Sequence, residues 1–175
     1  VGVGHISAVF SAFDQAEDRS VALKVFDAGL AGDEGFVERL LEAAELASVL
    51  NHPNIVEIYD WGVDGGPYIV SELCEGGSLA ALLEEGNRLA TSQALVVTLA
   101  CARAMNYGHE QGAIHGNLTP RNLLFTSDQQ VRISDYGLAN VILDVPKAPE
   151  SRALESVRYA SPEQERGRLV NESSD

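Results

Sequence analysis

The spacing of apolar residues changes once along the chain, near residues 75–78. Before this point, short apolar runs such as residues 21–26 are separated by polar or glycine-containing turns, a pattern typical of β-strands. After it, residues 92–110 repeat apolar side chains at helical spacing, so that Leu95, Leu99, Ala102 and Met105 share one face. Strands first and helices afterwards predict an α+β protein.

The individual elements follow from the same patterns. The first part is expected to contain one amphipathic helix, at residues 36–50, which Pro53 helps to end because proline disfavours helix in the residue before it. Ser78 is a suitable N-cap for a short helix at residues 79–85. The predicted strands lie at residues 8–13, 21–26, 55–59, 68–73, 123–125 and 131–133.

Charge and composition exclude several classes of protein. The 175 residues carry 12 Lys and Arg against 26 Asp and Glu, a net charge of −14. Nucleic acids and anionic membrane surfaces require clustered basic residues, so we expect neither as a partner. The longest apolar run, residues 94–102, is too short to cross a bilayer. Two isolated cysteines in apolar stretches indicate a reducing compartment.

Lysine is rare here, with ten arginines but only Lys24 and Lys147. Lys24 lies within an apolar strand pattern, where it either points to solvent or neutralises phosphate oxygens in a cleft. The preference for arginine elsewhere favours the second interpretation. The preceding pattern Gly2-x-Gly4-x-x-Ser7 is either a tight turn or a backbone cradle for phosphates, with nothing to separate the two.

A second group of polar residues follows short apolar strands in the later part of the chain. Asp135 comes directly after the strand at 131–133 and is followed by Tyr136 and Gly137. With Asn122 as a second oxygen ligand, Asp135 would suit Mg²⁺, which accepts few protein ligands and completes its shell with phosphates and water. Taken alone, Asp-Tyr-Gly would be only a turn.

The order of these motifs resembles that of the eukaryotic-type protein kinases, most closely the bacterial Ser/Thr kinases. The motifs are the glycine-rich pattern, Val-Ala-Leu-Lys (21–24), His-Pro-Asn-Ile-Val (52–56), His-Gly-Asn-Leu-Thr-Pro-Arg-Asn-Leu-Leu (115–124), Asp-Tyr-Gly (135–137) and Ser-Pro-Glu (161–163). The resemblance implies a two-lobed kinase-like fold. Residues 1–74 would form a strand-rich N-lobe with one regulatory helix and an incomplete first strand, and residues 75–175 the first part of a truncated helical C-lobe.

The resemblance implies ATP and Mg²⁺ as cofactors. Lys24 would then bind the α- and β-phosphates, Asn122 and Asp135 the metal, and the turn with Gly2 and Gly4 would cover the phosphates.

The same resemblance implies an adenine site between the lobes. Val9 and Ala22 would pack above the adenine and Leu124 below it, and Glu72 and Cys74 would present hinge backbone groups to its edge. Residues 171–175 resemble the start of a large buried helix at which an Asp anchors the catalytic loop. A lobe ending there would expose apolar surface along residues 95–105.

The acidic helix partner of Lys24 is ambiguous. In the family, a Glu usually lies nine residues before the loop histidine, here His52, and that position is Ala43. Either the Lys–Glu pair is absent, or a one-residue insertion near Ser48 restores Glu42 to this role. We favour Glu42.

Departures from the family concentrate on catalysis. Asn117 replaces the Asp that accepts the substrate proton, a loss that typically costs about 10²–10⁴-fold in rate. Thr119 replaces a Lys that binds the γ-phosphate, where one electrostatic donor contributes roughly 10²–10³-fold. Gly116 replaces the Arg that would hold a phosphorylated activation loop.

These departures predict a pseudokinase in bacterial signalling, which binds ATP and Mg²⁺ and regulates or scaffolds a protein partner. One alternative is an active, atypical Ser/Thr kinase with protein substrates, since the phosphate- and metal-binding residues remain. Another is an interaction domain that binds no nucleotide. We expect a cytoplasmic domain that makes no membrane contact itself, although its parent protein could be membrane-anchored.

Overall fold

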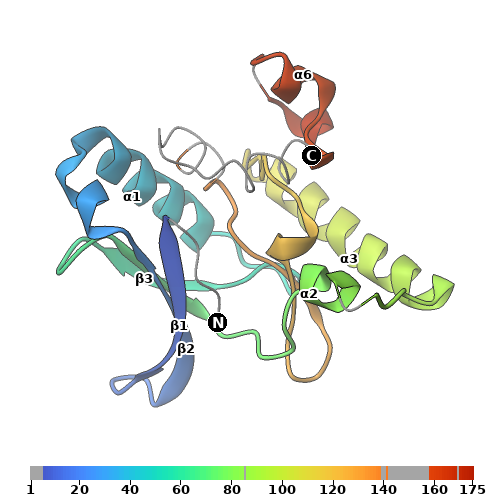
Figure 1. The fold of residues 1–175 in the computed structure, drawn as a ribbon, viewed down its shortest axis with the longest axis horizontal. Coiled ribbons are helices and arrows are strands. Elements are labelled where there is room, and N and C mark those ends of the chain that lie inside the picture. Colours follow the sequence, from blue (N-terminus) through green and yellow to red (C-terminus); the bar gives the residue numbers. More distant parts are fainter. Residues whose placement is uncertain (1–5, 85, 139–140, 142–157, 169) are drawn as a thin grey trace.

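The first part of the chain forms a four-stranded antiparallel sheet, and the second part is mainly helical (Figure 1). The computed structural model describes residues 6–84, 86–138, 141, 158–168 and 170–175. The strand order is β1-β2-β4-β3. The strands are β1 (Ser7–Asp14), β2 (Arg19–Phe26), β3 (Ile58–Gly62) and β4 (Tyr68–Glu72).

Helix α1 (Glu34–Ser48) packs its apolar face against the inner side of this sheet. A short 3₁₀ turn, η1 (Ala28–Gly32), precedes it, and Asp33 caps it by accepting a hydrogen bond from the Phe36 backbone N–H. Its buried residues are Phe36, Leu40, Ala43, Ala44 and Ala47. The helix begins and ends two residues before the predicted 36–50, because the cap at Asp33 and the turn after Ser48 set its limits.

One predicted strand is displaced. Residues 55–59 were expected to be extended, but β3 begins only at Ile58, and Ile55 forms an isolated parallel bridge with Ile133 instead. This bridge attaches the segment between α1 and β3 to the second part of the chain. The displacement therefore arises from a long-range contact.

The second part contains α2 (Leu79–Glu84), α3 (Thr91–Glu110) and a two-stranded ribbon, β5 (Leu123–Phe125) with β6 (Val131–Ile133). The ribbon bounds match the prediction, and the Ser78 hydroxyl caps α2 by accepting from the Ala81 N–H at 3.1 Å. Further short helices among the described residues are η2 (Pro120–Asn122), α6 (Pro162–Glu165) and η3 (Glu172–Ser174). The division of the chain at residues 74 and 75 stays a prediction.

Helix α3 buries only part of its apolar surface. Leu95 and Leu99 are 66% and 51% exposed. Met105, predicted on the same face, is instead buried against Tyr136. Among the described residues, no helix combines the length and hydropathy needed to cross a membrane.

Candidate functional site

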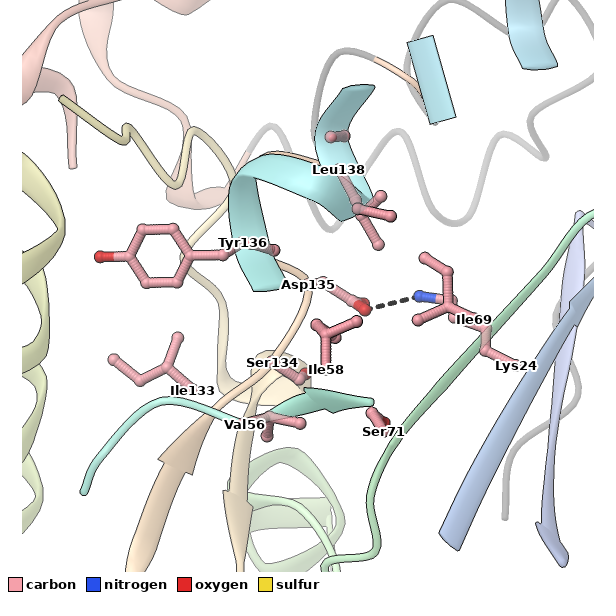
Figure 2. Close-up of a pocket in the computed structure, with 13 residues that line it drawn as sticks. Lys24, Val56, Ile58, Ile69, Ser71, Ile133, Ser134, Asp135, Tyr136 and Leu138 are labelled. Atoms are coloured by element: carbon pink, nitrogen blue, oxygen red, sulfur yellow. Dashed lines mark hydrogen bonds and ion pairs between the residues drawn. The ribbon is translucent and has the colours of Figure 1, made fainter. Parts of the chain in front are cut away.

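Lys24 and Asp135 form an ion pair between the sheet and the segment after β6 (Figure 2). Lys24 Nζ lies 2.6 Å from Asp135 Oδ1, and the two side chains are 11% and 23% exposed. Lys24 stands in the middle of β2, opposite Val9 on β1 and Ile69 on β4. The Lys24 side chain therefore points into the molecule and not to solvent. Its contact with phosphate remains a prediction.

The predicted pairing of Lys24 with Glu42 is wrong in this structure. Glu42 is exposed on the outer face of α1, whereas Ala43 is 8% exposed and lines the cavity beside Lys24. The reason is the orientation of α1 (Glu34–Ser48), whose buried face carries Ala43 and Ala47. The helix therefore turns the side chains of Ala43 and Ala47 inward, and Lys24 pairs with Asp135.

A small cavity of about 40 Å³ lies beside the ion pair. Its walls are apolar apart from Lys24, Asp135, Tyr136 and two serines, of which Ser71 lies on the sheet side (Figure 2). The apolar lining residues are Ala43, Ala44, Ala47, Val56, Ile58, Ile69, Ile133 and Leu138. Ligand sites are typically about 300–1,000 Å³, so this recess is not by itself a nucleotide site.

The residues expected around adenine lie on neighbouring segments. Ala22 on β2 is opposite Ser71 on β4, Val9 on β1 is opposite Lys24, and Leu124 on β5 forms a bridge with Ser78. Their contact with an adenine remains a prediction. Gly2 and Gly4 lie outside the described residues.

The hinge segment is attached to the second part of the chain by an ion pair. Arg132 Nε on β6 lies 3.0 Å from both carboxylate oxygens of Glu72, the last residue of β4. Burial, with a contribution from Glu72, raises the pKa of the Cys74 thiol to about 12, so Cys74 stays protonated at neutral pH. That the backbone groups of Glu72 and Cys74 face adenine remains a prediction.

His115 is completely buried and has a structural environment. With Nε2 taken as the protonated nitrogen, it donates to the Ser134 carbonyl at 2.9 Å while Nδ1 accepts from the Asn117 N–H at 3.2 Å. Burial lowers the pKa of His115 despite the opposing effects of the Ser134 carbonyl, Asp175 and Asp135. A neutral imidazole with both nitrogens engaged holds the loop in place.

Asn122 is buried at the end of the same loop. Its Nδ2 donates to the Asn117 carbonyl at 2.7 Å, and its backbone carbonyl accepts from the Ser134 N–H at 2.9 Å. Since the amide nitrogen holds the loop, the side-chain oxygen is the group Asn122 can offer to a cation. One amide oxygen and the Asp135 carboxylate fit the oxygen donors of Mg²⁺, which takes one or two protein ligands plus phosphates.

The two substituted catalytic positions lie in this loop. Asn117 is half-buried and Thr119 is 6% exposed. The nearby Arg121 forms an exposed ion pair with α2, its Nη2 lying 3.5 Å from Glu84 Oε1. Neither substituted side chain can accept a proton or supply a positive charge at neutral pH.

Asp175 anchors the loop backbone, as the sequence indicated for this position. Its carboxylate accepts from the N–H groups of His115 at 2.8 Å and Gly116 at 2.6 Å, and lies 3.0 Å from His109 Nε2. The side chain is 1% exposed. A buried carboxylate with three polar contacts is well satisfied.

The contact between Tyr136 and Gly108 was not predicted from the sequence. Figure 2 shows Tyr136 pointing away from Lys24, on the side opposite to Asp135. Its hydroxyl donates to the Ala104 carbonyl at 3.2 Å, and a Cβ at Gly108 would lie 2.3 Å from its oxygen. Gly108 therefore makes room for Tyr136 on α3.

Comparison with known proteins gives a consistent result. The family model for protein tyrosine and serine/threonine kinases matches residues 1–175. The chain is 35% identical to serine/threonine-protein kinase PknB of Mycobacterium tuberculosis and 34% identical to PrkC of Bacillus subtilis. It is aligned over its full length in both cases but spans only 29% and 27% of those proteins.

Solved structures agree with this result. The crystal structure of the Mycobacterium tuberculosis PknI kinase domain superposes with a TM-score of 0.78 at 26% identity, over all of this chain and 66% of that one. The predicted α+β, two-lobed kinase-like fold is thereby confirmed, as is the resemblance to bacterial Ser/Thr kinases. This chain belongs to the protein tyrosine and serine/threonine kinase family.

Proposed function

We propose that this domain binds ATP with Mg²⁺ but is impaired in phosphotransfer, and that it regulates or scaffolds a protein partner. The observation that carries the proposal is the presence of Asn117 in a loop whose supporting contacts are otherwise complete. Members of this family generally use ATP and Mg²⁺ and act on protein substrates.

Three residues support the binding half of the proposal. Lys24 would hold phosphate oxygens, and Asp135 and Asn122 would hold the metal. A bound Mg²⁺ neutralises phosphate charge. Because Lys24 contacts Asp135 at 2.6 Å, we expect Lys24 to share its hydrogen bonds between Asp135 and the phosphates after ATP enters.

Two residues support the impaired half. Asn117 has no basic group for the proton of a substrate hydroxyl. Ala43 faces Lys24 where the family usually has Glu, so nothing on the inner face of α1 orients the ammonium. Both changes reduce stabilisation of the transition state for phosphotransfer more than they reduce nucleotide affinity.

The second candidate is an active, atypical Ser/Thr kinase that transfers the γ-phosphate of ATP to protein hydroxyls. The close approach of Lys24 to Asp135, with Asn122 held by its loop, favours it. Phosphoryl transfer depends mainly on positioning and electrostatic stabilisation, so a weak base need not abolish it.

The test combines binding and turnover. Unfolding of the wild-type parent protein is followed with and without ATP and Mg²⁺, and ATP at 100 times its dissociation constant should add about 2.7 kcal/mol of stability. Phosphotransfer from radiolabelled ATP is then measured at saturation, with Lys24→Met as the control. Stabilisation without Lys24-dependent turnover supports the proposal. Robust Lys24-dependent turnover favours the active kinase, and no stabilisation favours an interaction domain.

We also infer a cytoplasmic location for this domain. Cys74 and Cys101 are both free thiols, which suits a reducing compartment. Fractionation of cells producing the parent protein, with protease protection to locate this domain, tests the inference. Cleavage of the domain by protease added outside intact cells would contradict it.

A further inference from the structure

The Gly116 peptide is held on both sides by residues from the end of the chain. Its N–H donates to Asp175 Oδ1 at 2.6 Å, and its carbonyl accepts from Gln164 Nε2 at 2.6 Å. Asp175 was expected from the resemblance, whereas nothing in the sequence indicated Gln164. In the family an Arg side chain occupies position 116, and here there is none.

Gln164 uses both ends of its amide. While Nε2 donates to Gly116, Oε1 accepts from the Ser161 N–H at 2.9 Å, as part of the capping box that begins α6. One side chain thus joins the start of α6 to the catalytic loop, through contacts that need no charged group.

The contact continues toward the metal-binding side of the site. Gly116 is followed directly by Asn117, whose carbonyl accepts from Asn122 Nδ2 at 2.7 Å. Movement of the Gly116 carbonyl would therefore move the group that orients the Asn122 amide. Lys24 and the adenine-facing strands are not part of this series of contacts.

We propose that Gln164 is a positioning residue, which holds the Gly116–Asn117 backbone and thereby orients Asn122 for the metal that accompanies the nucleotide. Because the contact is uncharged, it couples α6 to the loop without a phosphorylated side chain. The nucleotide part of this inference rests on the proposed function, whereas the positioning of Asn122 can be measured without any ligand.

The experiment compares Gln164→Met, which loses both hydrogen bonds, with Gln164→Glu, which keeps the acceptor for Ser161 but loses the donor to Gly116. Gln15→Glu, at an exposed turn position, is the charge-matched control. Hydrogen exchange of the Asn122 side-chain amide is measured by NMR without ligand. ATP affinity is then measured with Mg²⁺ and with a metal chelator, after thermal unfolding has shown that each variant is folded.

We expect Asn122 amide exchange to become at least about threefold faster in both Gln164 variants, because loss of one hydrogen bond typically weakens a contact by about 0.5–1.5 kcal/mol. Affinity for ATP with Mg²⁺ should fall about 3–10-fold, while ATP affinity in chelator changes less than about twofold. Gln15→Glu should change neither.

Unchanged Asn122 exchange would overturn the proposal, and so would an equal loss of ATP affinity with and without metal, which would indicate general loosening. If the wild type binds no ATP, the proposed function fails while the exchange measurement still decides the role of Gln164. Should Gln164→Met fail to fold, Gln164→Glu decides the matter by the same criteria.

Discussion

Two regions flank the candidate site, and they differ in what they retain. On the sheet side, Lys24 and Asp135 form a close ion pair. On the loop side lie Asn117 and Thr119, which we propose stand where the family has a base and a cation. Charge is present where we propose that phosphate and metal bind and is absent where we propose that a proton would move, so the proposal treats binding and catalysis as separable.

The loop that carries Asn117 and Thr119 is well supported by structural contacts. His115, Asp175 and Asn122 still hold the backbone by buried hydrogen bonds. Such contacts stabilise the fold whether or not the domain catalyses anything, because an unmade buried hydrogen bond costs about 1–3 kcal/mol. A well-formed loop is therefore not evidence of activity.

The largest expected effect comes from restoring the base. Asn117→Asp in the parent protein should raise the rate of phosphotransfer by about 10²–10⁴-fold, because a positioned general base returns. Radiolabelled phosphate transfer to a generic protein substrate measures it, with Asn87→Asp as a control for added charge. A change of less than about threefold would indicate that Asn117 is not a disabled base.

The next largest effect is expected at Lys24, on the sheet side of the site. Lys24→Met should lower ATP affinity by roughly 10–100-fold, since a hydrogen bond to a charged group contributes about 1.5–3 kcal/mol. Calorimetric titration with ATP and Mg²⁺ measures this change. Equal affinity in the variant would show that the ammonium serves only its pair with Asp135.

Gly108→Ala tests the contact that orients Tyr136. Because the added Cβ would lie 2.3 Å from the tyrosine oxygen, the free energy of unfolding should fall by about 1–3 kcal/mol, offset in part by the better helix propensity of alanine. Urea denaturation gives the value, and combination with Tyr136→Phe should recover part of it. Additive losses would mean that the two residues are independent.

The pH dependence of stability tests His115. Because its pKa is lowered in the folded state, the unfolded chain binds more protons below pH 6.5, and stability falls as the pH falls below that value. His115→Gln should reduce this slope by at most about 1.4 kcal/mol per pH unit. Some slope should persist, since the pKa of His52 is also lowered by burial. An unchanged slope between pH 6.5 and 5 contradicts the assignment.

The smallest effect is expected at Glu42. Glu42→Ala should change ATP affinity by less than about twofold, because this carboxylate is exposed on the outer face of α1. The matched substitution Ala43→Glu, on the inner face, should change it more in the same titration. A larger loss of affinity from Glu42→Ala than from Ala43→Glu would indicate that Glu42 pairs with Lys24 after all.

Short motifs predicted the fold and drew attention to Lys24 and Asp135, because each motif pairs a local pattern with a chemical group. The ion pair between these two residues was not predicted, since it joins strand β2 to the segment after β6. Counting back from His52 led correctly to Ala43, whereas the one-residue insertion assumed in order to restore Glu42 led to the wrong side chain, because adjacent residues of a helix point in different directions. The contacts of Gln164 with Gly116 and of Tyr136 with Gly108 join distant segments through single atoms, and no local pattern indicates them.

The central claim is that nucleotide binding survives where phosphotransfer does not. The most direct measurement is phosphotransfer from radiolabelled ATP by the wild-type parent protein, at ATP and Mg²⁺ concentrations shown by calorimetry to saturate it. The proposal predicts saturation with turnover no greater than that of Lys24→Met. Turnover well above that of Lys24→Met, or no saturable ATP binding, would contradict it.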